Sequence, residues 1–319
     1  MAVWAKKGTK EAVIRENFVI LHPVMRKTIF CFFATVAAAC GPQTAQEPQQ
    51  EPQDAGDTAA VRIAVTPTLD CMPLFVAADR HLFERAGLSI GITPFQAQMD
   101  QDTAVMAGSV AGAMTDLVRA ERLKSQGVGL RYATATEASW QLLTSRTARV
   151  KQPHQLNDKM VAMTRFSATH LLCDLMVDSS RLPSEHVFRI QVNDVAVRLN
   201  MLQVGNMDAL LLPEPQATAA RNMKAYVLYD SRKADVRLGV LALREGALDS
   251  AQWKTLQQVY DEACDSLNER GLAAYADVIR ERTGVARRTI DSLPADYRFA
   301  HWAQPREADI ERARKWLKK

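Results

Sequence analysis

Short apolar runs and segments with helical spacing alternate along most of this 319-residue chain. Runs such as VRIAV at residues 61–65 and LSIGIT at residues 88–93 contain β-branched residues and predict buried strands. Residues 72–86 have Phe75 and Leu82 among their apolar positions and predict a helix that ends at Gly87. The same criteria predict strands at residues 111–114, 128–133, 140–146, 159–164, 188–192, 209–212, 226–230 and 238–243, and helices at residues 102–107, 116–126, 169–179 and 194–204.

This alternation indicates two consecutive α/β units. Strands that are separated by helices of this length form parallel sheets with helices on both faces. After residue 243 the pattern becomes helical, with amphipathic segments at residues 249–269, 272–283 and 306–317. Residues 61–319 are long enough for one two-lobed domain or two small domains. We therefore predict an α/β protein with a mainly parallel sheet in each unit and a helical C-terminal tail.

The first forty residues have the features of an export signal. Arg26 and Lys27 precede an apolar run at residues 28–39 that ends in three alanines before Cys40, as in secretory signals. The run is shorter than the roughly 20 apolar residues that span a bilayer. Its end resembles a bacterial lipobox, which implies cleavage before Cys40 and a lipid on that cysteine. Met25 is then the expected start of translation; the alternative is an uncleaved apolar segment with a buried cysteine.

Residues 41–60 separate this signal from the first predicted strand. They are rich in Pro, Gln and acidic residues, and apart from Pro they have no apolar side chain larger than Ala. Such a segment cannot bury enough surface to offset the entropy of ordering it. We predict a disordered tether between the lipid-bearing cysteine and the folded part of the chain.

Charge and cysteine content argue against several kinds of partner. Six of the 40 basic and two of the 36 acidic residues lie in the first forty positions, which leaves 34 of each from Cys40 onward. A nucleic-acid partner is therefore not expected. Cys71, Cys173 and Cys264 are far apart and odd in number, which favours buried thiols over disulfides. The six histidines show no paired spacing and no cysteine pair has metal-ligand spacing, so neither a metal nor another cofactor is expected.

Five segments, in this order along the chain, carry a family resemblance. They are PLFVAADRHLFERAGLSI at residues 73–90, MAGSVAGAMTD at 106–116, QLNDKMVAMTRFSATHLL at 155–172, VRLNMLQVGNMDALLLPEP at 197–215 and QPREADIERARKWL at 304–317. With them the chain resembles the substrate-binding proteins of ABC importers in the nitrate, sulfonate, taurine and thiamine-pyrimidine group. The resemblance covers nearly all of the folded part, although His81 stands where the family usually has glycine.

The resemblance implies a two-lobed type 2 periplasmic-binding fold with two crossover strands. The first lobe would hold residues 61–134 and 231–319, and the second residues 135–230, after the signal (1–40) and the tether (41–60). It also implies a function: a small organic solute, such as a sulfonate or a thiamine-pyrimidine precursor, is captured between the lobes and delivered to an ABC permease. The expected carrier is a monomer that its lipid holds at the membrane, in the periplasm or on the cell surface.

Candidate ligand contacts follow from the position of the loops. In open α/β sheets the ligand lies beyond the carboxyl ends of the strands, which here lead into residues 66–70, 96–98, 115–116 and 134–137 in the first lobe and 164–169, 193–194 and 213–215 in the second. The residues that we predict to bind ligand are Thr66, Thr68, Asp70, Gln96, Asp116, Thr136, Trp140, Arg165, Ser167, Thr169, Asn193, Asp194 and Glu214.

One group of these residues suits an anionic ligand. Ser167 or Thr169 would cap a helix whose free amides face the cleft, and Arg165 adds a positive charge suited to carboxylate, sulfonate or phosphate. Without a ligand role, Arg165 is a solvated loop cation and Ser167 an ordinary cap. Trp140 either packs in the core or stacks on a flat ligand.

The acidic residues point the other way. Four carboxylates around one cleft, those of Asp70, Asp116, Asp194 and Glu214, would repel an anion and favour an amine or a protonated heterocycle. Asp116 and Asp194 each precede a predicted helix, however, and capping that helix is the competing interpretation. The sequence leaves the charge of the ligand open.

Catalytic residues are not predicted. The chain has no GxSxG, Walker or GxGxxG motif. His170 and Cys173 lie three residues apart near the start of a predicted helix, where we expect packing neighbours rather than a catalytic pair. Two alternative functions remain: an enzyme of the same fold that acts on a pyrimidine or menaquinone precursor, and a lipoprotein domain that senses a ligand.

Overall fold

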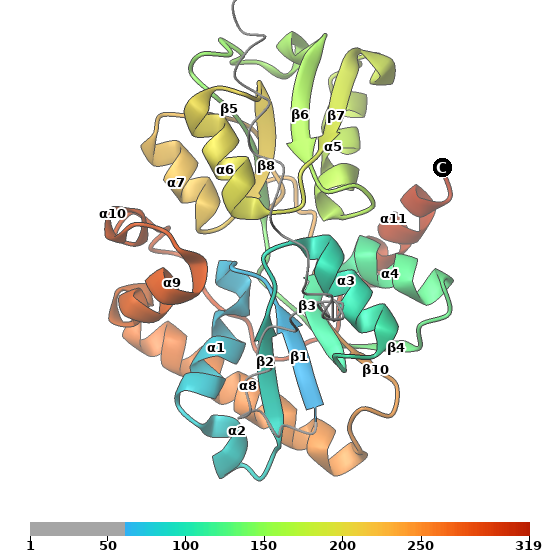
Figure 1. Ribbon diagram of the computed structural model, residues 1–319, viewed down its shortest axis with the longest axis vertical. Coiled ribbons are helices and arrows are strands. Elements are labelled where there is room, and N and C mark those ends of the chain that lie inside the picture. Colours follow the sequence, from blue (N-terminus) through green and yellow to red (C-terminus); the bar gives the residue numbers. More distant parts are fainter. Residues whose placement is uncertain (1–60) are drawn as a thin grey trace, which may run out of the picture. The chain divides into compact units, whose positions relative to one another are not determined.

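The computed structural model describes residues 61–319, which form two five-stranded sheets flanked by helices (Figure 1). The first sheet has the order β2-β1-β3-β10-β4 and contains β1 (Val61–Val65), β2 (Ile90–Pro94), β3 (Gly112–Asp116), β4 (Leu130–Ala135) and β10 (Gly239–Arg244). The second has the order β7-β6-β8-β5-β9 and contains β5 (Trp140–Thr144), β6 (Lys159–Met163), β7 (Val187–Gln191), β8 (Ala209–Pro213) and β9 (Tyr226–Asp230). We call each sheet with its helices a lobe.

Both sheets combine parallel strands with one reversed strand. β1 pairs parallel with β2 and β3, while β10 is antiparallel to β3 and β4. β6 likewise pairs parallel with β7 and β8, while β5 is antiparallel to β8 and β9. The predicted fold class, two mainly parallel α/β lobes followed by C-terminal helices, is confirmed.

Helices follow most of the strands. The first lobe begins with η2 (Leu69–Cys71), α1 (Met72–Asp79), α2 (Leu82–Arg85), α3 (Gln98–Ala107) and α4 (Leu117–Ser125). The second lobe has η3 (Pro153–Leu156), α5 (Ala168–Ser179), η4 (Ser184–His186), α6 (Val195–Val204) and α7 (Gln216–Asn222). After β10 come α8 (Ser250–Arg270), η5 (Leu272–Tyr275), α9 (Ala276–Thr283), α10 (Arg287–Ile290) and α11 (Glu307–Leu317).

Every strand and helix predicted from the apolar pattern overlaps an observed element, but α7 and α10 were not predicted. α7, QATAARN, has no large apolar residue that could reveal a helical period. The helix predicted at residues 72–86 is in fact broken, because His81 has a φ of 54° in the left-handed region. Glycine adopts that conformation at little cost, which explains why the family usually has glycine there.

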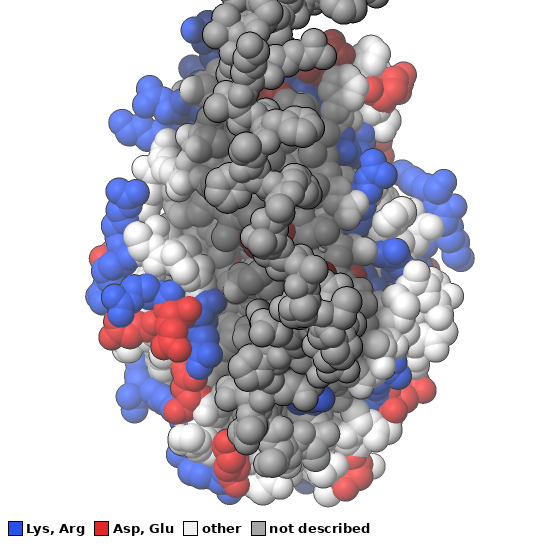
Figure 2. All heavy atoms as spheres, in the orientation of Figure 1, with Lys and Arg blue, Asp and Glu red and all other residues white. Residues whose placement is uncertain are grey.

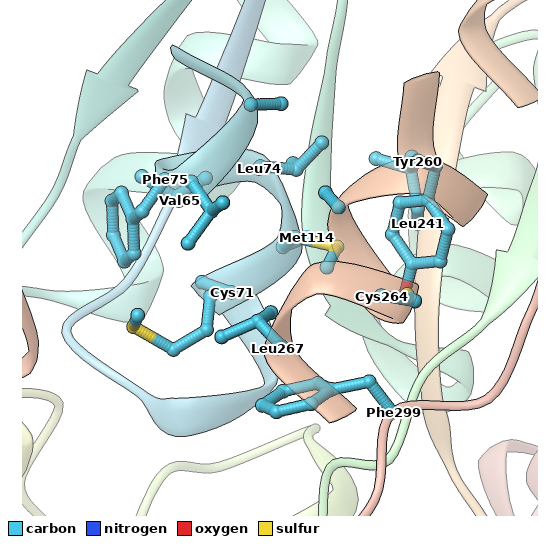
Figure 3. Close-up of a cluster of buried hydrophobic side chains, with 14 of the residues drawn as sticks. Val65, Cys71, Leu74, Phe75, Met114, Leu241, Tyr260, Cys264, Leu267 and Phe299 are labelled. Atoms are coloured by element: carbon cyan, nitrogen blue, oxygen red, sulfur yellow. The ribbon is translucent and has the colours of Figure 1, made fainter. Parts of the chain in front are cut away.

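The cores follow from the alternation of side chains along each strand. In the first sheet, Val65 and Leu241 belong to the cluster that packs with Leu74 of α1 and Leu267 of α8 (Figure 3). Ala64, next to Val65, instead belongs to a cluster with residues of α3 and α4. The second sheet is covered in the same way by α5 on one face and by α6 and α7 on the other. The apolar faces of helices therefore cover both faces of each sheet.

The cysteines of the described residues lie inside these cores. Cys71 and Cys264 belong to the cluster in Figure 3, and Cys173 belongs to the cluster under α5. All three are buried and free, so the predicted buried thiols are confirmed. Cys40, the predicted lipid attachment site, lies outside the described residues, as do the predicted signal and tether.

Two segments connect the sheets, residues 136–139 after β4 and residues 231–238 after β9. Hydrogen bonds join the ends of each segment to the strand next to the other: Thr136 N donates to Gly239 O of β10 at 3.0 Å, and Trp140 N of β5 donates to Ser231 Oγ at 2.9 Å. A Cβ atom at Gly239 would lie 2.3 Å from Thr136 Oγ1, so glycine allows this close approach. The two connections therefore run side by side.

The last helix contacts helices of both lobes. α11 packs against α4, where Arg314 Nε donates to Glu121 Oε2 at 2.8 Å. Trp316 Nε1 of α11 donates to Asp174 Oδ2 of α5 at 2.9 Å. The C-terminal helix thus joins the helix after β3 to the helix after β6.

Charged side chains of both signs lie around the edge of the face shown in Figure 2. Within residues 61–319, no helix combines the length and the apolar character needed to cross a membrane.

Candidate functional site

The loops at the carboxyl ends of the strands bring the two lobes into contact. Leu69 N, after β1, donates to Glu214 O, after β8, at 2.8 Å. Gln216 Nε2 donates to Pro67 O at 2.8 Å, and Ala97 forms an isolated antiparallel bridge with Asp194. Most of the predicted ligand-binding loops are therefore close together at one interlobe interface.

In the first lobe, the residues after β1 form a buried polar group. Thr66 Oγ1 and Thr68 Oγ1 lie 3.2 Å apart, and Thr136 Oγ1 of the connecting segment donates to Asp70 Oδ2 at 3.3 Å. All four residues are buried. Burial raises the pKa of the Asp70 carboxyl, and the hydrogen bonds from Thr68 and Thr136 only partly offset this rise. The structure thus brings together four of the predicted residues.

Asp116 lies at the end of β3 and caps α4, as its capping interpretation predicted. Its Oδ1 accepts from Arg119 N at 3.0 Å and also from Ala168 N of the second lobe at 2.9 Å. Burial raises the pKa of Asp116 to about 6, although the charge of Arg119 lowers it. Asp116 is therefore both a helix cap and a direct contact between the lobes.

The start of α5 faces this carboxylate. Ser167 is the N-cap residue of α5, and its Oγ accepts from Thr169 N at 3.1 Å, which confirms its predicted capping role. The hydroxyls of Ser167 and Thr169 lie 2.8 Å apart, and both residues are buried. Arg165 is exposed, and no hydrogen bond or ion pair joins its side chain to the described residues. The helix start is therefore built into the interface, while the adjacent cation points to solvent.

Glu214 is buried in the turn before α7, and its carboxylate is hydrogen-bonded to residues of that helix. Its Oε2 accepts from Thr218 N and Thr218 Oγ1 at 3.0 and 2.7 Å, and Oε1 accepts from Arg221 at 2.9 Å. The sequence placed Glu214 in the loop after the strand predicted at residues 209–212, and the structure agrees, since Glu214 lies in the turn between β8 and α7. Its main-chain oxygen, rather than its carboxylate, reaches the first lobe.

The remaining predicted residues lie at the edge of this interface or away from it. Gln96 is exposed, and Asn193 accepts a hydrogen bond from Gln191 at 3.3 Å. Asp194 caps α6 by accepting from Val197 N at 3.0 Å. Trp140 is buried in the apolar cluster under α5, in agreement with packing rather than stacking.

Comparison with known proteins identifies the family of this chain. The model of the family described as NMT1/THI5 like matches residues 68–236, just over half of the chain. The chain belongs to the NMT1/THI5-like family. A search of curated proteins found no match.

Solved structures share the fold of this NMT1/THI5-like protein. The alkanesulfonate-binding protein SsuA from Xanthomonas axonopodis pv. citri, bound to MOPS, has a TM-score of 0.68 and 17% identity, covering 82% of this chain and 92% of its own. The aliphatic sulphonate-binding protein SsuA from Escherichia coli has a TM-score of 0.67 and 19% identity, and the match covers 81% of this chain and 86% of the SsuA chain. The nitrate-binding protein NrtA from Synechocystis has a TM-score of 0.63 and 13% identity, and the match covers 76% of this chain and 73% of the NrtA chain. The predicted family resemblance is confirmed.

Eight side chains of the described residues carry a buried polar atom without a hydrogen-bond partner, among them Arg198, Arg282, Asp309 and Arg312. The other four lie at or near the carboxyl ends of strands. They are Gln98 Oε1 and Thr115 Oγ1 in the first lobe and Thr164 Oγ1 and Gln216 Oε1 in the second. Gln98, Thr115 and Thr164 lay within the predicted loops without being singled out. Gln216 was missed because α7 was missed. Gln98 and Gln216 begin α3 and α7, Thr164 directly follows β6, and Thr115 is the last residue but one of β3.

A pocket of about 330 Å³ lies beside Gln216. Its wall includes Leu199 and Asn200 of α6, Met223 after α7, residues 283–286 at and after the end of α9, and Arg288 and Thr289 of α10. The pocket is therefore bordered by the second lobe and by the C-terminal helices. Since Gln216 also donates to Pro67 O, one side chain connects the pocket with the interlobe contact.

The described His, Cys, Asp and Glu side chains are poorly placed for metal binding or nucleophilic catalysis. Within residues 61–319, no cluster of three or more His, Cys, Asp or Glu side chains could hold a metal ion. Burial raises the pKa of the Cys173 thiol to about 12 and lowers the pKa of His170. His170 instead packs edge-on against Trp316, with ring centroids 4.8 Å apart. This arrangement fits packing neighbours, and a thiol with so high a pKa is a poor nucleophile.

Proposed function

We propose that this protein is an extracytoplasmic solute-binding lipoprotein that captures a small organic solute between its lobes and delivers it to an ABC permease. The observation that carries the proposal is the set of buried, unpaired polar atoms on Gln98, Thr115, Thr164 and Gln216. An unpaired buried polar group costs about 1–3 kcal/mol. A solute that supplies hydrogen bonds to both lobes would remove that cost.

Solute binding of this kind also gives the permease a way to distinguish loaded from empty protein. Contacts from both lobes exist only when the lobes are together, so a bridging solute shifts the population toward the closed arrangement. The side-by-side connections at Thr136 and Gly239 suit a hinge between the lobes. The solved relatives that bind sulfonates or nitrate support the same role for this fold.

A thermal-shift screen with full-length protein tests the proposed function. The panel contains sulfonates, pyrimidines, amino acids and aromatic acids. A true solute at about 100 times its Kd stabilises the folded protein by about 2.7 kcal/mol, which is easily detected. A panel without any stabilising compound, together with turnover of one of them, would replace the binding function by an enzyme of the same fold.

Replacing Thr164 with Val separates solute binding from stability. The Thr164 hydroxyl has no partner among the described residues, so we expect Thr164→Val to fold as stably as wild type and to bind a solute from the screen about 5–10-fold more weakly, the effect of one hydrogen bond. The matched control is Thr144→Val, because the Thr144 hydroxyl donates to Val150 O at 2.6 Å. The control should lose stability and keep its affinity. Equal affinities of Thr164→Val and wild type would remove Thr164 from the site.

Membrane anchoring is the second part of the proposed function. We expect wild type to incorporate labelled fatty acid and to sediment with membranes, and Cys40→Ser to do neither. Cys31→Ser is the matched control, since Cys31 lies within the predicted signal and its loss should leave lipidation unchanged. Recovery of unlabelled wild-type protein from the cytosol would contradict export and anchoring.

A further inference from the structure

Two helices from opposite lobes begin at one carboxylate oxygen. Asp116 Oδ1 accepts the N–H of Arg119 in the first turn of α4 and the N–H of Ala168, the first residue of α5. Only 1% of the surface of Asp116 is exposed. Helix N-termini carry unpaired N–H groups and a positive partial charge. Two of them that converge from two lobes form a site for an anion, and the protein's own carboxylate fills it.

The nearby cation does not provide an ion pair for this carboxylate. The buried Arg119 guanidinium donates to both oxygens of Asp102, at 3.0 and 2.5 Å, and to Gln101 Oε1 at 2.8 Å. No ion pair within residues 61–319 includes Asp116. The hydrogen bonds that hold its carboxylate come from the two backbone amides, so an external anion could reach these amides only by displacing Asp116.

The buried atoms without a partner among the described residues include acceptors and hydroxyls at the strand ends, and two donors, Nε and Nη2, of Arg198 on α6. Gln98 Oε1 and Gln216 Oε1 are acceptors and require hydrogen-bond donors. Thr115 and Thr164 carry hydroxyls that accept as readily as they donate. Asp70 adds another buried carboxyl at the same interface. Donor-bearing groups, such as the amino group of a heterocycle, satisfy the two glutamine acceptors, whereas a sulfonate or carboxylate brings acceptors only.

We propose that Asp116 is a built-in counter-anion that sets the specificity of the interlobe site. Its carboxylate takes the amides that a sulfonate, carboxylate or phosphate would need, and its charge repels such a group. The accepted solutes are then neutral or cationic organic molecules with N–H donors. This inference rests on the proposed function, because it names the solute class of the same site.

The test compares methanesulfonate with its neutral isostere methanesulfonamide on purified full-length protein at pH 8. We expect Asp116→Ala to bind methanesulfonate at least about ten-fold tighter than wild type, since it frees both amides and removes a repelling charge. Methanesulfonamide should change by less than about three-fold, because charge repulsion does not affect a neutral molecule. Isothermal titration measures both affinities.

Asp116→Asn and a second aspartate serve as controls. Asn keeps an acceptor oxygen for the amides and loses only the charge, so Asp116→Asn should show a smaller gain for methanesulfonate and remains informative where Asp116→Ala does not fold. Asp194→Ala removes a carboxylate that caps α6 through Val197 N without accepting from the start of α5, and should show no gain. Asp116 variants that bind methanesulfonate no tighter than wild type would overturn the assignment.

The two proposals fail in different ways. A screen without any stabilising solute ends the solute-binding function but leaves the methanesulfonate comparison valid, because that comparison measures a gain over wild type. A neutral or cationic solute that binds wild type, combined with no gain in the Asp116 variants, rejects only the role of Asp116. An anionic solute that binds wild type tightly and Asp116→Ala weakly rejects it as well.

Discussion

Replacement of Arg119 with Met is expected to lower the free energy of unfolding by about 3–5 kcal/mol, the usual cost of removing one partner of a buried ion pair. Arg119 is 2% exposed and donates to both oxygens of Asp102, to Gln101 Oε1 and to Gln98 O. Met has a similar reach but leaves the Asp102 carboxylate buried without its partner. Urea unfolding followed by circular dichroism measures the change.

Two further variants make this expectation specific. Arg85→Met removes an ion pair with Glu262 whose side chains are both more than half exposed, and should cost less than about 1 kcal/mol. The double variant Arg119→Met with Asp102→Asn removes both charges and should recover part of the loss. A loss in Arg119→Met no greater than that in Arg85→Met would show that the buried network contributes little.

The second large effect is a dependence of stability on pH that Asp116 alone produces. Burial raises the pKa of Asp116 from 3.8 to about 6, against the lowering effects of Arg119 and the two amides, while Asp102 raises it slightly. The folded protein therefore binds a proton at this site more tightly than the unfolded chain does. Between about pH 6 and pH 4, this group makes the protein more stable as pH falls, by on the order of 2–3 kcal/mol in total.

Comparison with Asp116→Asn isolates this contribution, because the amide side chain does not titrate. The stability of the variant relative to wild type should be highest at pH 8 and fall by about 2–3 kcal/mol by pH 4.5. Chemical unfolding of both proteins across this range provides the curves. Asp194→Asn shows how much of the change comes from replacing any capping carboxylate. Parallel curves for wild type and Asp116→Asn would mean that Asp116 has no raised pKa.

The apolar pattern predicted the fold well, because the central strands β3 and β8 are buried throughout and helices such as α4 and α11 are amphipathic. It failed where a helix owes little to large apolar residues. α7, with its run of Gln, Ala and Thr, begins against the first lobe through Gln216 and closes on Glu214 through Arg221. Neither contact has a local signal in the sequence. Gln216, the first residue of α7, was therefore missed as a candidate.

For Asp116 and Ser167, too, the sequence revealed local contacts but no contacts between distant segments. The sequence predicted correctly that each caps a helix, since capping depends on neighbours within a few residues. It did not predict that the cap of α4 also accepts from the start of α5, because that contact depends on how the two lobes dock. The hypothesis of an anion site at the start of α5 therefore stays a prediction, and it did not foresee that Asp116 accepts from the Ala168 amide there.

The position of α11 has a practical consequence. Its Trp316 indole bonds to Asp174 and packs against His170, both on α5, while the body of α11 packs on α4. Any movement of α5 away from α4 must pull the indole out of one of these surroundings. If the lobes open as proposed, the surroundings of the Trp316 indole change, and in a variant that keeps Trp316 as its single tryptophan the emission would follow opening in real time without an attached dye.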